Sequence, residues 1–167
     1  PVLMALGGSV HLASSAGERR LEIEDFFLGY RHTALMPGEI LSAVTIPKPS
    51  SSVRMATYKL SRRRELDISA VCAAFAVELD TDGSVSWARL AFGGMAATTK
   101  RARSVEQALV GKPFDEAHVR QAAALLSDDF QPIADHRGSV WYRETIARNL
   151  LIGFCAEARS PGCKALP

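Results

Sequence analysis

The densest group of charged side chains lies within residues 58–75, YKLSRRRELDISAVCAAF. Four bases and two acids stand close together there: Lys59, Arg62, Arg63, Arg64, Glu65 and Asp67. Apolar runs precede and follow this group, so a core strand is expected to leave the core as a polar loop and then return. Ordering such a loop costs about 1–2 kcal/mol of free energy per residue. The segment is either a solvated hairpin end with exposed ion pairs, or a basic rim that binds an anionic ligand and is braced by its own acids.

The rest of the chain carries no complete catalytic motif. No G-x-S-x-G or P-loop sequence is present, and Gly93-Gly94 lacks the third glycine of a dinucleotide fingerprint. Asp135 and Arg137 are expected to stabilise the loop before the last helix. The histidines show no metal-ligand spacing; they are His11, His32, His118 and His136. If this chain takes part in catalysis, a cofactor or another polypeptide must carry the chemistry.

Composition narrows the class of protein. The chain has 167 residues, of which 47% are hydrophobic and 23% charged, which is typical of a soluble globular domain or of one domain with part of another. A net charge of +2 argues against nucleic-acid binding, and no apolar run reaches the roughly 18–20 residues of a membrane span. Cys72, Cys155 and Cys163 form no C-x-x-C pair, which argues against a disulfide framework, a zinc site or an iron–sulfur site in this chain. We expect a cytoplasmic location.

The first third of the chain has the pattern of short strands. Residues 1–6 are apolar and are interpreted as a strand entered midway, which suggests that the chain is a fragment. Residues 9–13 and 19–23 alternate and predict a hairpin, and a short turn is expected at 24–27. Residues 39–46 predict another strand, which Pro47 and Pro49 end. The segment KPSSS that follows is the expected domain boundary.

The remaining chain predicts strands first and helices afterwards. Strands are expected at residues 55–60, 71–80 and 85–92, the last two joined by a Thr81-Asp82-Gly83 turn. Three helices follow, at 102–110, at 116–126 with Asp115 as its cap, and at 140–158 with Ser139 as its cap. The last helix is expected to place Trp141, Ile146, Leu150 and Phe154 near a common face. This order predicts an α+β fold, with helices packed on one face of a small antiparallel sheet.

Four segments resemble the flavin domains of xanthine dehydrogenases in the molybdenum hydroxylase family, in the same order and over nearly the whole chain. They are DFFLGYRHTALMPGEILSAVTIP, YKLSRRRELDISAV, AFGGMAATTKRARSVEQALVGKPF and DHRGSVWYRETIARNLL. The resemblance implies that residues 1–50 are the C-terminal part of an FAD-binding domain. It implies that residues 51–158 are the C-terminal domain of such flavoproteins, and residues 159–167 a tail.

The resemblance also implies a set of FAD-contacting residues. Leu41 matches a leucine that follows a Glu-Ile pair, and Lys59 matches the lysine that opens the charged segment. Residues 60–67 would run beside the isoalloxazine ring near the approach of NAD, and Arg63 and Asp67 match positions there. Leu66 stands where vertebrate relatives carry an acid, so their loop-based switching between NAD and oxygen does not transfer. The family's principal glycine-rich pyrophosphate segments are absent, and the chain alone is expected to bind FAD weakly or not at all.

The implied activity belongs to an assembly. Purine hydroxylation at a molybdopterin centre would send electrons through two 2Fe-2S clusters to FAD and then to NAD. The expected partners are upstream FAD and iron–sulfur segments of the same subunit and a molybdenum-binding large subunit, in a hetero-oligomer. Cations beside the flavin would favour its reduced, anionic form. Two alternatives remain: a flavoprotein segment of another molybdenum hydroxylase, of the carbon monoxide dehydrogenase type, or a mainly structural docking domain.

Overall fold

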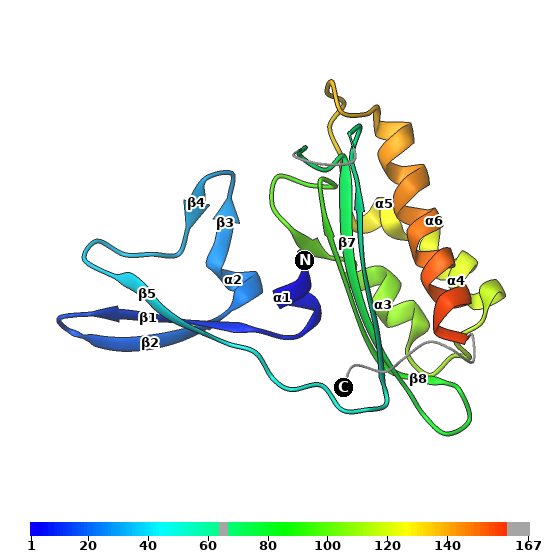
Figure 1. Cartoon of the computed structure of the whole chain (residues 1–167), viewed down its shortest axis with the longest axis horizontal. Helices are drawn as coiled ribbons and strands as arrows, with labels where there is room; N and C mark the ends of the chain where they lie inside the picture. Colours follow the sequence, from blue (N-terminus) through cyan, green and yellow to red (C-terminus); the bar gives the residue numbers. More distant parts are fainter. Residues whose placement is uncertain (64–66, 160–167) are drawn as a thin grey trace.

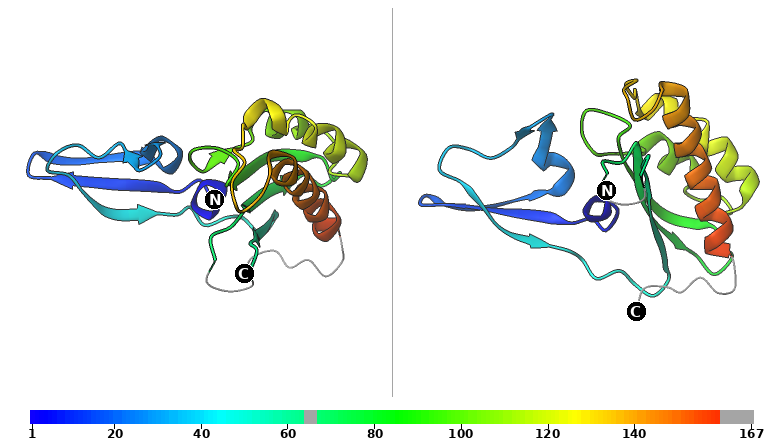
Figure 2. Two further views of the ribbon diagram at one scale, coloured as in Figure 1. Left: turned by 90° about the horizontal axis from the view of Figure 1, so that it is seen from above. Right: turned by 45° about the horizontal axis from the view of Figure 1, so that its top comes forward.

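The computed structural model describes residues 1–63 and 67–159 (Figure 1). It has two parts, which we call the arm (residues 9–46) and the C-terminal domain (residues 53–159). Within the described residues, a three-stranded sheet and a two-stranded sheet lie in the arm, and a four-stranded sheet lies in the C-terminal domain. The arm projects away from the C-terminal domain, and a short N-terminal helix lies between them (Figures 1 and 2).

The arm is built on an antiparallel sheet of order β2-β1-β5. Its strands are β1 (Ser9–Ser14), β2 (Gly17–Glu22) and β5 (Ile40–Thr45). The predicted hairpin at residues 9–23 is confirmed by β1 and β2. The predicted turn at residues 24–27 overlaps α2 (Ile23–Phe26), after which β3 (Phe27–Gly29) pairs with β4 (His32–Thr33).

The expected strand at residues 1–6 is wrong. Val2–Ala5 form a helical turn, α1, in which the Ala5 amide donates to the Pro1 carbonyl at 2.9 Å. Four consecutive apolar residues carry no alternation that would separate a strand from a helix. The helical turn lets Met4 pack with the arm residues around Leu12, while Ala5 packs on Ala74 and Ala76 of the C-terminal sheet.

The C-terminal domain confirms the predicted α+β fold. Its antiparallel sheet has the order β6-β7-β8-β9, from Val53–Leu60, Val71–Leu79, Val85–Gly93 and Lys100–Arg101. Figure 2 shows the following helices on one side of this sheet. They are α3 (Arg103–Leu109), α4 (Glu116–Ala123), α5 (Leu126–Asp129) and α6 (Val140–Arg159). Both predicted caps are confirmed: Asp115 accepts from the His118 amide at 2.9 Å, and Ser139 from the Tyr142 amide at 3.1 Å.

The single helix expected at residues 116–126 is instead two helices, α4 and α5. The break after Ala123 turns the chain so that the Asp129 carboxylate reaches the first turn of α3. There it accepts hydrogen bonds from the Ser104 amide at 3.0 and 3.1 Å and from the Ser104 hydroxyl at 3.0 Å. A carboxylate near the start of a helix satisfies amides that the helix itself leaves without partners.

The core of the C-terminal domain lies between its sheet and its helices. Phe75 on β7 is fully buried, and its ring centre lies 5.1 Å from that of Phe92 on β8 and 5.5 Å from that of Phe154 on α6. Trp141 does not share this face as expected, since it is 71% exposed. Five residues separate it from Ile146, which places it well off the inward stripe of a 3.6-residue helix. Arg143 occupies the inward position of the first turn instead.

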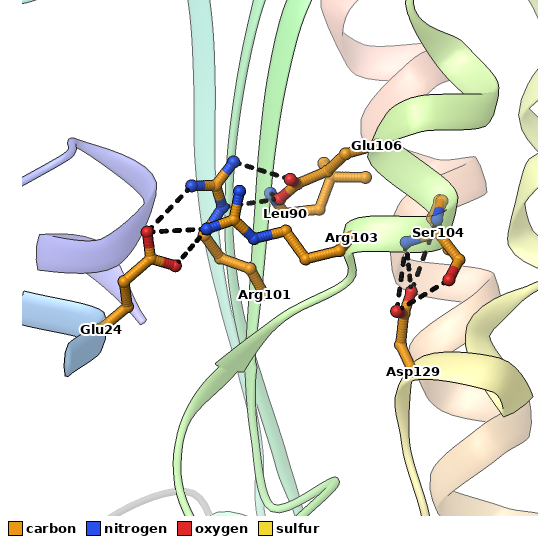
Figure 3. Close-up of polar contacts among 8 residues, drawn as sticks. Glu24, Leu90, Arg101, Arg103, Ser104, Glu106 and Asp129 are labelled. Atoms are coloured by element: carbon orange, nitrogen blue, oxygen red, sulfur yellow. Dashed lines mark hydrogen bonds and ion pairs between the residues drawn. The ribbon is translucent and has the colours of Figure 1, made fainter. Parts of the chain in front are cut away.

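The two parts are joined by a chain of polar contacts (Figure 3). Glu24 on α2 accepts from Arg103 at 2.7 Å and lies 3.5 Å from Arg101. Arg101 in turn donates to the buried Glu106 carboxylate at 2.7 and 3.0 Å, and Glu106 also accepts from the Leu90 amide at 2.7 Å. A surface contact between the parts is therefore continuous with a buried ion pair inside the C-terminal domain.

Candidate functional site: the charge loop

The charge loop, which we define as residues 61–70, joins β6 to β7. The two strands pair without a bulge up to Leu60 and Val71, and the Ala70 amide donates to the Leu60 carbonyl at 2.8 Å. The loop therefore begins and ends at neighbouring points on one end of the sheet. The predicted Arg64 and Glu65 and the substituted position Leu66 lie outside the described residues.

Hydrogen bonds brace the described part of the charge loop from within. The Ser61 hydroxyl donates to the Arg63 carbonyl at 2.5 Å, and the Arg63 amide donates to Asp67 Oδ2 at 3.1 Å. The backbone hydrogen bond from Arg63 is the main cause that lowers the pKa of Asp67, with further contributions from the Ile68 amide and the Arg63 charge. Asp67 is thus an ionised brace for the loop backbone.

Lys59 and Arg63 present their charges to solvent. Lys59 is exposed on β6, where it pairs with Cys72 of β7, and Arg63 is exposed in the charge loop. Among the described residues Lys59 has no carboxylate partner, whereas the Arg63 charge acts on Asp67 and helps to lower its pKa without a salt bridge between the two side chains. Both cations can therefore meet an anionic group without first breaking a salt bridge with a described residue.

The structure brings together three of the four predicted contact residues. Lys59, Arg63 and Asp67 lie at the same end of the β6–β7 hairpin. Leu41 lies apart from them on β5 of the arm, where it pairs with Leu12 of β1 and is 43% exposed. The four predicted residues thus lie on two separate surfaces, one on the arm and one on the C-terminal domain.

Two residues that sequence reasoning did not single out as site residues, Asp135 and Arg143, hold the charge loop from outside. The buried Arg143 guanidinium donates to the carbonyls of Ala70 and Gly94, the latter at 2.8 Å. It also donates to Asp135 Oδ1 at 2.6 Å. The expected role of Asp135 and Arg137 in the preceding loop is confirmed, since Asp135 accepts from the Arg137 amide at 2.8 Å. A charged residue at an inward position of α6 is the sequence signal that could have pointed to Arg143.

Desolvation raises the pKa of Asp135, but the hydrogen bonds that it accepts outweigh this effect. They come from the Arg137 backbone and from the Arg143 guanidinium, and they hold the pKa well below its usual range. Asp135 is therefore a carboxylate under all ordinary conditions, which keeps the Arg143 charge paired in its buried position.

A cavity of about 440 Å³ lies between the arm and the C-terminal domain, but none of the four predicted contact residues lines it. Its walls come from α1, from the α2–β3 segment and from residues 98–103, with Glu24, Lys100 and Arg101 as charged members. Among the described residues, no group of His, Cys, Asp and Glu could hold a metal ion. The same residues include no helix long and apolar enough to cross a membrane.

Residues 56–158 match the family model described as the CO dehydrogenase flavoprotein C-terminal domain. The chain belongs to this family. Residues 1–49 match a second model, the FAD binding domain in molybdopterin dehydrogenase. The family predicted from the sequence is confirmed, and FAD is confirmed as the cofactor that it implies.

Relatives of this flavoprotein segment differ in the substrates that their names state. The chain is 37% identical to nicotinate hydroxylase hnxS and 35% identical to xanthine dehydrogenase, both of Emericella nidulans; each match covers 92% of this chain and 12% of the relative. The solved CO dehydrogenase of Oligotropha carboxidovorans superposes with a TM-score of 0.84 at 29% identity, covering 91% of this chain and 52% of that one. The chain therefore spans about half of that CO dehydrogenase chain and about an eighth of the two fungal enzymes.

Proposed function

We propose that this chain forms one wall of the FAD site in a molybdenum hydroxylase, with the charge loop beside the isoalloxazine ring. The carrying observation is a pair of exposed cations, Lys59 near the end of β6 and Arg63 in the charge loop that Asp67 braces. The described residues fit such a role because neither cation forms a salt bridge with a carboxylate among them. Leu41, on the arm, would contact the same cofactor from the FAD-binding part of the chain.

FAD, when bound, supplies the acceptance and release of an electron pair. The protein side of this chemistry is electrostatic. The positive charges of Lys59 and Arg63 would stabilise the reduced, anionic form of the flavin more than its oxidised, neutral form. Asp67 accepts a hydrogen bond from the Arg63 amide and so holds the backbone from which the Arg63 side chain extends.

We propose further that the assembled enzyme is a cytoplasmic xanthine dehydrogenase with NAD as its acceptor. Its iron–sulfur and upstream FAD segments would belong to the same subunit, and a large subunit would hold the molybdopterin. The similarity to the xanthine dehydrogenase of Emericella nidulans supports this assignment. A CO dehydrogenase type of enzyme is the second candidate, which the superposition on the solved CO dehydrogenase favours. Comparing turnover of xanthine, nicotinate and CO by the purified assembly distinguishes the candidates.

The proposed placement is tested in the assembled enzyme by the substitution Lys59→Met, at the end of β6 where the charge loop begins. We expect the flavin to become harder to reduce, by about tenfold in the equilibrium constant, which is about 30 mV for a two-electron couple. A spectroelectrochemical titration measures this shift. Lys112→Met is the matched control, because Lys112 is also exposed but lies near Val85, at the opposite end of the sheet.

Equal flavin potentials in Lys59→Met, Lys112→Met and the unmodified enzyme would contradict the proposed placement of the charge loop. Loss of subunit assembly in Lys59→Met, with flavin content and potential unchanged, would instead support the docking alternative. In that case the charge loop would be an interface for another subunit rather than a wall of the FAD site.

A further inference from the structure

We propose that Arg143, held by Asp135, is a positioning residue that fixes the charge loop and thereby sets where Arg63 stands. This inference rests on the proposed function, in which Arg63 faces the flavin. Neither Arg143 nor Asp135 would touch the cofactor; they would act through the loop.

The first support is that the Arg143 guanidinium binds two backbone carbonyls and one carboxylate at once. Nη1 donates to the carbonyls of Ala70 and Gly94, and Nη2 donates to Asp135. Ala70 is the last residue of the charge loop, and Gly94 directly follows β8. The Arg143 side chain is 4% exposed, so these bonds form away from water, where their geometry is most restrictive. One side chain of α6 therefore ties the end of the charge loop to the end of a neighbouring strand.

The second support is a separate attachment at the other end of the charge loop. Arg62 Nη1 donates to the His136 carbonyl at 2.8 Å. His136 lies in the turn that Asp135 and Gly138 close, through backbone hydrogen bonds of 3.1 and 3.2 Å. The turn thus contacts the beginning of the charge loop directly through His136, and Asp135 in the turn binds the Arg143 guanidinium that holds the end of the loop.

The third support is the close approach that Gly94 permits. Gly94 has φ of +82°, and a Cβ at this position would overlap the Ala70 carbonyl and crowd the Arg143 guanidinium. A residue with a side chain would be strained in this conformation and would displace the end of the charge loop. The Gly93-Gly94 pair, which has no value as a dinucleotide motif, therefore has a packing role at the anchor of the loop.

The inference is tested in the assembled enzyme by Arg143→Lys, alone and combined with Arg63→Met. Lysine keeps the positive charge but cannot reproduce the planar fork that reaches two carbonyls and a carboxylate. Arg63→Met should make the flavin about tenfold harder to reduce in the otherwise unchanged enzyme. We expect this effect to fall to less than about threefold in the Arg143→Lys background, because a displaced loop no longer holds Arg63 beside the ring. This coupling is a readout that a general loss of stability does not produce.

Arg148→Lys is the matched control. Arg148 lies on the same helix, is 39% exposed at its side chain, and contacts Glu144 at 3.7 Å. Arg148→Lys should leave the effect of Arg63→Met unchanged. If Arg143→Lys does not fold, Arg62→Lys serves in its place. It keeps the positive charge of the loop but cannot reproduce the hydrogen bond from the Arg62 guanidinium to the His136 carbonyl, which lies on the surface.

The outcomes separate this inference from the proposed function. If Arg63→Met shifts the flavin potential equally in both backgrounds, the positioning role of Arg143 is overturned and the proposed function stands. If Arg63→Met has no effect in either background, the placement of the charge loop beside the flavin is overturned, and the positioning role fails with it.

Discussion

The arm and the C-terminal domain are both antiparallel sheets, but they are covered very differently. On β7 the central residues are buried between helices and strands, whereas all six residues of β5 are exposed. The exposed residues of β5 include Ile40, which is 66% exposed, and Val44. The difference is that the C-terminal domain covers its sheet with its own helices, while the arm leaves β5 uncovered among the described residues and buries only a small cluster around Leu12.

The largest expected effect comes from breaking the core of the C-terminal domain. Phe75→Ala removes a fully buried ring that packs against Tyr58, Phe92 and Phe154. We expect the free energy of unfolding to fall by about 3–5 kcal/mol. Denaturant unfolding followed by fluorescence and circular dichroism measures this change.

Leu12→Ala is the matched substitution in the arm, where Leu12 is also fully buried. We expect its cost to be local: amide exchange should speed up in residues 9–45 and stay slow in residues 71–93. Equal acceleration in both segments would show that the two parts unfold as one unit, and the proposed difference between them would be lost.

The next effect sharpens the comparison at the contact in Figure 3. Glu106→Ala leaves the buried Leu90 amide and the Arg101 guanidinium without their carboxylate. We expect a loss of about 3 kcal/mol in the free energy of unfolding, because removing one partner strands the other in a buried position. Glu116→Ala, which breaks the exposed pair with Arg120, is the control and should change stability by less than about 0.5 kcal/mol.

A smaller effect is expected from the other carboxylate that contacts Arg101. Glu24→Ala removes the ion pairs between the arm and the C-terminal domain, but Glu24 and Arg103 remain partly in water. We expect the free energy of unfolding to fall by less than about 1 kcal/mol, by the same denaturant measurement. A loss as large as that of Glu106→Ala would mean that the contact between the two parts is as important for stability as the buried pair.

The smallest effect is a pH dependence confined to the arm. Hydrogen bonds from Arg19, and then from the Met36 amide, lower the pKa of Glu39 from 4.5 to about 2. Because the folded pKa is depressed, the contribution of Glu39 is complete above about 4.5 and is lost as the pH falls toward about 2. Amide exchange in residues 9–45 should accelerate over this range. In Glu39→Gln the acceleration should be absent; if it persists, another group is responsible.

Local patterns predicted most of the fold because the decisive interactions are short in sequence. Asp115 caps the helix that begins at the next residue, and the turn at Asp82 and Gly83 joins adjacent strands. The helical turn at residues 2–5 could not be predicted from its apolar run, since its conformation follows from packing between two cores. The inward place of Arg143, in the turn where Trp141 was expected to face the core, likewise depends on a polar partner that local periodicity does not reveal.

The candidate site could be predicted only in part. The density of charge around Arg63 pointed to the charge loop directly, and the acid that braces it lies four residues away. The anchor of the loop could not be found in this way, because 73 residues separate Ala70 from Arg143 and 49 separate Gly94 from Arg143. Contacts of such separation depend on the assembled sheet and helix rather than on any local pattern.

The unbroken pairing of β6 with β7 has a consequence for engineering. Every pair from Val53↔Glu78 to Leu60↔Val71 keeps one register, so residues 61–69 can be exchanged without shifting a side chain of the sheet from one face to the other. The charge loop could thus be replaced while the pairing of β6 with β7 stays the same. Chimeras that carry the loop of a CO dehydrogenase or a nicotinate hydroxylase, with Ala70 and Gly94 retained, would transplant the electrostatics of one relative into the scaffold of another.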